Sequence, residues 1–224
     1  MVPQSPYDRK VEGLFSSGRI RKYPRNQLVH YQGDALTNIY LIKKGYIKAY
    51  TILDSGETRT LLILGPGDIF PIVFSLSLDW SNYYAKYFYQ ALSDVDLKSI
   101  ESDKFKELIE SSKDNLNIYM HYMSSSNQTL MSQLEVMKNK HSLDKLKLLL
   151  PFLVMKLGEK IGPGTYKLRI KLSHQEIADL SGVTRETTTT LVKSLEKAGI
   201  LEQKQGFFII HTGQIEDIFK EQLG

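Results

Sequence analysis

The chain has 224 residues, no cysteine and a formal net charge of +4. This length can bury a sizeable core, most simply as two domains, and the missing cysteine excludes disulfides, thiolate redox switches and a cysteine-ligated iron–sulfur cluster. No apolar run approaches the roughly 18 residues of a membrane span, and residues 1–10 lack the apolar core of a signal peptide. We therefore expect a cytoplasmic protein with no membrane partner. Its mildly basic charge permits nucleic-acid binding without establishing it.

Short strands separated by glycine turns are predicted from about Arg21 to Phe105. Apolar runs end at turn residues of the Gly-Asp, Lys-Gly, Ser-Gly and Gly-Pro-Gly kind, and they cover residues 28–31, 39–42, 46–53 and 58–64. Strands of four to eight residues with a glycine turn about every ten positions indicate an antiparallel sandwich or barrel.

A short helix at 103–109 is followed by a long one that begins after Lys113. Mostly apolar residues recur along it at alternating spacings of four and three: Leu116, Met120, Met123, Asn127, Leu130, Leu134, Met137 and His141. This is the core pattern of a coiled coil, narrower than the stripe of a helix that packs on its own domain, and it predicts a homodimer interface along Leu116–Met137. Asn127 is the one amide in the seam: it either pairs across the axis and fixes register, or faces water where the helices splay.

The heptad pattern fades at residues 138–141, where we place a hinge. Ser142 is expected to cap a helix whose apolar face includes Leu143, Leu146, Leu149, Leu150 and Leu153. A turn at 162–164, a strand at 166–172, a hairpin of 200–204 with 207–211 and a closing helix at 215–223 complete the chain. The hairpin is typical of the wing of a winged helix.

Residues 173–199 carry the most specific pattern, SHQEIADLSGVTRETTTTLVKSLEKAG. Ser173 followed by Glu176 forms a capping box at a helix start, Gly182 supplies a tight turn, and Thr184 can cap a second helix. That second helix has an apolar face at Thr188, Leu191, Val192, Leu195 and Ala198, and an opposite face at Arg185, Glu186, Thr189, Thr190 and Lys193. Two helices joined by a short glycine turn indicate a helix-turn-helix motif.

An ordinary helical hairpin is the alternative interpretation. The Arg-Glu pair argues against it, because Arg185 suits the two guanine acceptors of the major groove and Glu186 can accept from cytosine. Four successive threonines are also costly in a helix that serves structure alone, whereas outward hydroxyls and methyls can meet phosphate or thymine. The expected DNA-binding residues are Ser173, Thr184, Arg185, Glu186, Thr189, Thr190 and Lys193.

With these motifs, residues 172–202 resemble the helix-turn-helix of the cyclic-AMP receptor protein/fumarate-nitrate regulator (Crp/Fnr) family of bacterial transcription factors. The order Gly33-Asp34, IYLIKKGYIKAY and LLILGPGDIF is similar to the sensor half of that family. The resemblance implies an α+β fold, with an antiparallel β-roll sensor domain at 1–110, a dimerisation helix and hinge at 111–141, and a winged helix-turn-helix at 142–224. It also implies that Arg185-Glu186 reads the centre of each half-site.

The sensor region departs from the cyclic-nucleotide pattern. Members that bind cyclic nucleotides carry Gly-Glu-Leu soon after Gly-Asp and then Arg-Ser/Thr-Ala. Here Asp68 is followed by Ile69-Phe70-Pro71, and the later segment 83–88 has no arginine and Lys86 as its only cation. A buried phosphate without a bidentate arginine is poorly stabilised, so we expect an effector other than cyclic AMP. Its expected pocket is lined by Gly67, Asp68, Ile69, Phe70, Tyr84, Lys86, Tyr87, Met123 and Asn127.

Aromatic residues are dense in the same region, at Trp80, Tyr83, Tyr84, Tyr87, Phe88 and Tyr89. Either alternate rings fill the core of the roll while the others cover its surface, or the rings line a pocket for a flat or apolar effector. The sequence leaves both interpretations open.

No catalytic or metal-binding constellation is evident. The five histidines are scattered singly, and His174 is expected on the surface of the first short helix. We predict a DNA-binding regulator rather than an enzyme, with an inverted-repeat duplex, a second copy of itself and RNA polymerase as candidate partners. Two alternatives stay open: a small-molecule-binding protein whose helix-turn-helix contacts protein, and a DNA-binding regulator that needs no ligand.

Overall fold

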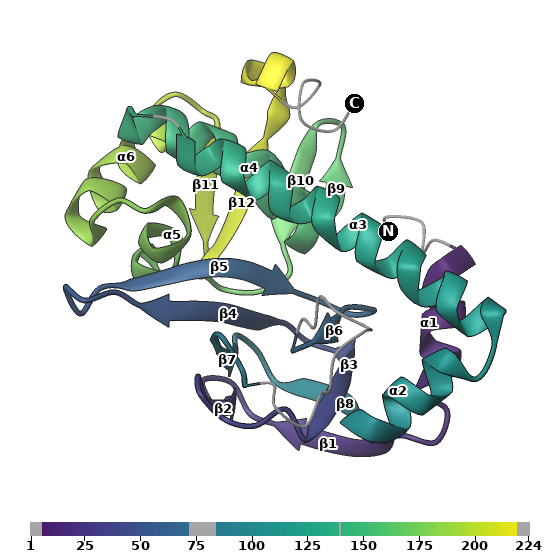
Figure 1. Ribbon diagram of the computed structural model, residues 1–224. Coiled ribbons are helices and arrows are strands. Elements are labelled where there is room, and N and C mark those ends of the chain that lie inside the picture. The colour runs from purple at the N-terminus through teal and green to yellow at the C-terminus, as the bar shows by residue number, and fades with distance from the viewer. Residues whose placement is uncertain (1–5, 72–83, 139, 219–224) are drawn as a thin grey trace. The chain divides into compact units, whose positions relative to one another are not determined.

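The structure is a computed structural model that describes residues 6–71, 84–138 and 140–218 (Figure 1). Side chains are described for residues 10–71, 84–127, 131 and 140–218. The described chain divides into two units. One holds most of the chain up to Gln128, and the other holds Ile52–Thr60 together with the chain from Thr129 onward.

Two four-stranded sheets form the roll, as the sequence predicts. One sheet has the order β1 (Arg19–Tyr23), β8 (Val95–Glu101), β3 (Asn38–Lys44) and β6 (Ile69–Phe70), and its pairings are antiparallel. The other has the order β2 (Leu28–His30), β7 (Phe88–Ala91), β4 (Ile47–Ile52) and β5 (Thr58–Leu64). Burial alternates along β7 and β8, as expected of strands with one face on a core and one toward water.

Three helices pack on the core of the roll: α1 (Pro6–Leu14), α2 (Ser102–Glu110) and α3 (Lys113–Lys138). The ring of Phe105 lies between those of Phe15 and Tyr119, with centroid distances of 5.1 and 5.8 Å. Aromatic pairs at these distances stabilise a core beyond the area that they bury. Sequence reasoning did not predict α1, because only Val11 and Leu14 of this polar helix reach the core.

The first half of α3 corrects the prediction of a narrow coiled-coil seam. Ile118, Tyr119, Tyr122 and Met123 pack against the core of the roll, so the apolar arc of the helix is wider than the heptad alone. Met123, which the heptad assigns to the dimer seam, is therefore partly covered by its own domain. On the rest of the seam, Leu116 and Met120 are exposed and so is Asn127, while the side chains of Leu130, Leu134 and Met137 lie outside the described ones.

The second sheet-bearing unit is a winged helix. It comprises α4 (Ser142–Leu157), β9 (Gly158–Gly162), β10 (Thr165–Leu168), α5 (His174–Ser181), α6 (Arg185–Lys197), β11 (Leu201–Lys204), β12 (Phe207–His211) and the short 3₁₀ helix η2 (Thr212–Gln214). Its sheet has the order β11-β12-β10-β9. The wing is confirmed, because β11 and β12 pair in antiparallel register around a turn at Gln205-Gly206.

Three details of this unit differ from the sequence predictions. The N-cap of α4 is His141, which makes no side-chain cap bond, so Ser142 begins the helix rather than capping it. The strand predicted at 166–172 ends at Leu168, and Ile170 and Leu172 are buried without forming a strand. β9 was missed because Gly158–Gly162 shows no apolar alternation. The closing helix is described only at residues 216–218.

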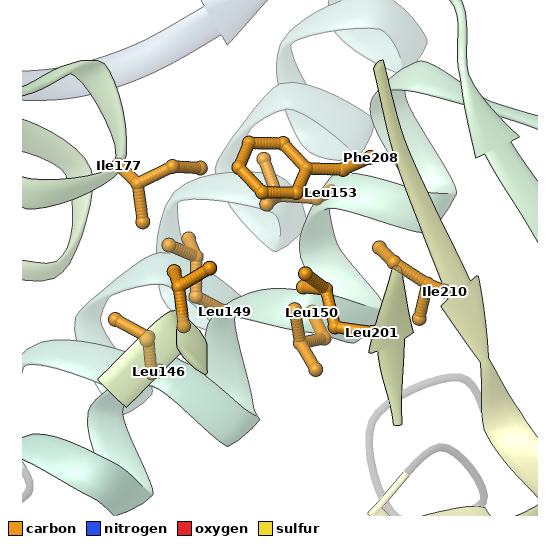
Figure 2. A pocket seen from close by; sticks show the side chains of 9 residues that line it. Leu146, Leu149, Leu150, Leu153, Ile177, Leu201, Phe208 and Ile210 are labelled. Carbon is orange, nitrogen blue, oxygen red and sulfur yellow. The ribbon is translucent and has the colours of Figure 1, made fainter. Parts of the chain in front are cut away.

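Apolar side chains line the space at the centre of the winged helix (Figure 2). Side chains from α4, α5, α6, β11 and β12 converge on a residual space of about 10 Å³, which is lined by Leu146, Leu149, Leu150, Leu153, Ile177, Val192, Leu201, Phe208 and Ile210. A space of this size has no room for an effector. The packing instead holds α5 and α6 against one scaffold.

His30 makes the stability of the roll sensitive to pH. Its ring is buried, and Nε2 has no hydrogen-bond partner. Burial lowers the pKa of His30, although Asp34, 3.6 Å from Nδ1, acts in the opposite direction. A histidine whose pKa is lower in the folded state binds its proton more readily when unfolded, so the stability that it contributes is present above about pH 6.5 and is lost as pH falls below that value.

We therefore expect the free energy of unfolding of the wild type, relative to His30→Leu, to decrease between pH 7 and pH 5. The slope is at most about 1.4 kcal/mol per pH unit. Denaturant titration at four pH values measures it, with His121→Gln on the exposed side of α3 as the control. A difference between wild type and His30→Leu that does not change with pH would contradict the assignment.

Candidate nucleic-acid interface

The first helix of the motif begins and ends as the sequence predicts. Ser173 Oγ accepts from the backbone N–H of Glu176 at 3.1 Å, and the Glu176 carboxylate accepts from the backbone N–H of Ser173, which completes the capping box. Gly182 has φ +68°, a left-handed conformation that favours glycine, and its N–H donates to Ala178 O at 2.9 Å. These contacts fix the turn between α5 and α6.

Helix α6 has one buried face and one exposed face. Thr184 is its N-cap, accepting from the N–H of Thr187, and three side chains face the core: Thr188, Val192 and Leu195. Arg185, Glu186, Thr190 and Lys193 are exposed, and Thr189 is half-buried. Within the described chain, neither Arg185 nor Glu186 forms an ion pair. Their hydrogen-bonding groups therefore remain available for a ligand.

The four consecutive threonines occupy four different environments. The hydroxyl of Thr187 accepts from Thr184 Oγ1 at 2.9 Å and joins the cap, whereas Thr188 is fully buried. Thr189 Oγ1 donates to Arg185 O at 2.9 Å, and Thr190 Oγ1 donates to Glu186 O at 3.2 Å. Such bonds to the carbonyl four residues earlier are a common way for threonine to satisfy its hydroxyl inside a helix.

Thr188 is the exception, because its buried Oγ1 has no hydrogen-bond partner. A buried hydroxyl without a partner costs about 1–3 kcal/mol. We expect Thr188→Val, which keeps the shape and removes the hydroxyl, to raise the free energy of unfolding by about 1 kcal/mol and to leave DNA affinity unchanged. Denaturant unfolding and a binding titration test the two halves of this prediction. Thr187→Val is the matched control, since it removes a hydroxyl that does have a partner.

His174 is not the free surface residue that the sequence suggested. Its Nδ1 lies 3.0 Å from Thr189 Oγ1, and its ring stacks on Phe208 with centroids 6.3 Å apart. The histidine thus ties the start of α5 to the exposed face of α6. No sequence pattern links residues 174, 189 and 208, so only the fold reveals this contact.

The wing adds basic groups that the sequence analysis did not single out. Lys167 Nζ and Lys171 Nζ lie 4.5 and 5.2 Å from the centroid of the Phe207 ring. Gln205 and Gly206, with φ +52° and +82°, form the tight turn that places Phe207 next to Lys204 on the opposite strand. Cation–π contacts hold two ammonium groups beside the hairpin.

The sensor residues lie on and around β6. Gly67 takes φ +94°, and Asp68 Oδ2 accepts from the N–H of Gly65 at 2.8 Å, which orders the turn before the strand. Ile69 and Phe70 are buried in the roll. Phe70 stacks between Tyr40 and Tyr89 at centroid distances of 5.1 and 5.2 Å.

Tyr122 joins helix α3 to this strand. Its Oη accepts from the N–H of Ile69 at 2.7 Å and donates to Ile69 O at 3.0 Å. Burial raises the pKa of Tyr122, and the nearby Asp68 carboxylate raises it further, so the phenol stays protonated. Sequence reasoning placed Met123 and Asn127 near the sensor and missed the tyrosine beside them. Met123 packs on the roll core, and Asn127 is exposed.

Of the described aromatic residues in this stretch, one lies in the core of the roll. Tyr89 is buried, whereas Phe88 is half-buried and stacks on Tyr50 at 5.2 Å. Tyr84 and Lys86 are exposed, and Tyr87 is half-buried. This arrangement favours the interpretation in which alternate rings fill the core. Trp80 and Tyr83 lie outside the described residues.

The part of the chain that the structure describes contains no group of three potential metal-ligating side chains. None of its helices combines the length and the apolar character that crossing a bilayer requires.

A β-roll and a long helix, followed by a winged helix-turn-helix, define a two-domain DNA-binding regulator. The family model described as cyclic nucleotide-binding domain matches residues 20–112, and that of the Crp-like helix-turn-helix domain matches residues 148–217. The chain belongs to the Crp/Fnr family of transcription regulators and is not an enzyme.

Relatives align over most of the chain. A global nitrogen regulator of Synechococcus elongatus is 25% identical over 82% of this chain and 81% of its own length. The cyclic AMP receptor protein of Thermus thermophilus is 24% identical over 88% of this chain and 86% of its own. The solved structure of FixK2 from Bradyrhizobium japonicum has a TM-score of 0.75 at 14% identity, covering 91% and 96% of the two chains, and it supports the fold.

Proposed function

We propose that this regulator is a homodimer that reads an inverted-repeat DNA site through α6 and responds to an effector other than cyclic AMP. One observation carries the proposal: Arg185 and Glu186 are exposed in the first turn of α6. The N-terminal residues of a recognition helix contact base edges in the major groove. Arginine and glutamate there suit guanine and cytosine.

The other proposed contacts hold the backbone of the duplex. Lys193 is exposed two turns along the same helix and suits phosphate, as do Ser173 and Thr184 at the starts of α5 and α6. Thr189 and Thr190 lie between Lys193 and the Arg185-Glu186 pair on this helix and are further proposed DNA contacts. A two-fold dimer would present its two α6 helices about 34 Å apart, one turn of B-DNA.

Exposed apolar residues on α3 support the dimer. Met120 and Met131 are 55% and 65% exposed, and Leu116 is 37% exposed, on a helix whose other side packs on the roll. We propose that Leu116, Met120, Met123, Asn127, Leu130, Leu134 and Met137 form the interface with a second copy. Such a seam buries the methionines and places Asn127 against its counterpart. RNA polymerase remains a candidate partner.

Residues that a cyclic nucleotide needs are missing from the proposed sensor, which comprises Gly67, Asp68, Ile69, Phe70, Tyr84, Lys86, Tyr87, Met123 and Asn127. No glutamate stands soon after Asp68, and no arginine stands near Lys86 in the sequence. The ring of Phe70 is stacked on both sides, by Tyr40 and Tyr89. Two relatives at 25% and 24% identity are named for nitrogen regulation and for cyclic AMP, so similarity of this degree does not carry the effector over.

We expect cyclic AMP and cyclic GMP not to bind measurably at physiological concentrations and to leave DNA binding unaltered. Each lost charge-assisted hydrogen bond forfeits about 1.5–3 kcal/mol. Calorimetry with each nucleotide, using a cyclic-AMP-dependent relative as the positive control, measures this directly. Micromolar binding would overturn the assignment and would mean that Lys86 or backbone N–H groups hold the phosphate.

Selection from a random duplex pool, followed by sedimentation of the complex, tests the proposed function. We expect enrichment of an inverted repeat bound by two chains, with affinity that falls steeply as salt rises. Protein that retains no duplex at low salt would favour the alternative in which the helix-turn-helix contacts protein.

A further inference from the structure

The outward threonines of α6, Thr189 and Thr190, donate their hydroxyl protons to groups within the protein. A threonine hydroxyl has one proton to donate. Thr189 Oγ1 lies 2.9 Å from Arg185 O and 3.0 Å from His174 Nδ1. His174 Nδ1 either accepts from this hydroxyl or donates to it, depending on the tautomer, and in both cases the Thr189 proton stays within the protein.

Thr190 is engaged in the same way. Its Oγ1 donates to Glu186 O at 3.2 Å, so it too has no proton left for a phosphate oxygen or a base. The other heavy atom on each Cβ is a methyl carbon, Cγ2. Thr190 is exposed and Thr189 half-buried on the face that carries Arg185 and Glu186. That face therefore offers two methyl groups beside one cation and one anion.

We propose that Thr189 and Thr190 read thymine through its C5-methyl group. This inference rests on the proposed function, since it requires α6 to lie in the major groove. Thymine is the one base that displays a methyl group there, and apolar side-chain contacts distinguish it from the other three. Each half-site then combines base pairs read by hydrogen bonds from Arg185 and Glu186 with neighbouring A·T pairs read by methyl contact.

His174 strengthens the argument for Thr189. If the Thr189 hydroxyl turned outward to a phosphate, it would leave both the Arg185 carbonyl and the imidazole nitrogen of His174. The ring of His174 is held in place by its stacking on Phe208, so it would not follow the hydroxyl. With its proton engaged, the hydroxyl can only accept a hydrogen bond, and thymine presents no donor in the major groove, so the methyl is the branch that can contact thymine.

The test removes the methyl group from each thymine of the DNA and, separately, the methyl or the hydroxyl group from each threonine of the protein. After site selection with the wild-type protein, each thymine of the enriched site is replaced in turn by deoxyuridine, which removes only the methyl. Wild type, Thr189→Ser, Thr189→Val, Thr190→Ser and Thr190→Val are titrated against every duplex. For wild type, we expect about a three- to fivefold weaker affinity at each thymine that is read.

The valine variants should keep the preference for thymine, and the serine variant at the responsible position should bind thymine and uracil duplexes equally. Affinity for random duplex and the thermal midpoint show that each variant is folded. The proposal is overturned if serine keeps the wild-type preference and valine loses it, or if wild type is indifferent to every replacement. A wild-type protein that enriches no site overturns the proposed function itself, which is a different result.

Discussion

Arg185→Ala and Glu186→Ala should each weaken binding to the preferred site by about 1–3 kcal/mol while leaving affinity for random duplex nearly unchanged. Both side chains are exposed in the first turn of α6, and within the described residues neither is paired with another charge. Their removal therefore takes away base contacts without disturbing the fold. Specific affinity would fall about five- to 150-fold, and the ratio of specific to non-specific binding would fall with it.

Lys193→Ala is the matched control on the same face. A phosphate contact carries no sequence information, so this variant should weaken binding to selected and random duplex alike and should lower the salt dependence. Fluorescence anisotropy at three salt concentrations separates the two behaviours. Equal losses on both duplexes for Arg185→Ala and Glu186→Ala would show that these residues do not read bases.

Met120→Asp should separate the dimer into monomers. Met120 is exposed in the single chain, and the proposed seam would bury it against a second helix. A carboxylate buried there without a partner is strongly unfavourable, so we expect the dissociation constant to rise by roughly a hundredfold or more. Sedimentation at micromolar concentration should show dimeric wild type and a monomeric variant that still melts cooperatively.

Ser125→Asp places the same charge on an exposed position of α3 outside the seam and should remain dimeric. Wild-type protein that sediments as a monomer at micromolar concentration would refute the dimer proposal. DNA binding reports independently on the same change, because two half-sites can be bound together only by a paired molecule.

Local patterns predicted the motif well, because its determinants are close in sequence. The capping box at Ser173, the left-handed Gly182 and the cap at Thr184 each act over three or four residues, and all three are present in the structure. The strands were equally predictable, since β5 of the roll and β12 of the winged helix each bring a short apolar run into a core.

Contacts between distant residues were not predictable from the sequence. His174 meets Thr189 and Phe208 only because the hairpin folds back across the helices. Likewise, the heptad pattern accounts for one side of α3, whereas Tyr119 and Tyr122 on its other side pack against the core of the roll. Which of the four threonines joins the cap, which is buried and which is exposed also depends on how α6 packs against the core.

The two hydrogen bonds between Tyr122 and Ile69 connect β6, where the proposed sensor residues lie, to α3, the proposed dimer helix. A ligand that displaces β6 must either move α3 with it or break both hydrogen bonds between Ile69 and Tyr122. The Tyr122 phenol therefore links β6 to α3. If α3 forms the dimer interface, as we propose, a displacement of β6 would reach that interface through these two hydrogen bonds.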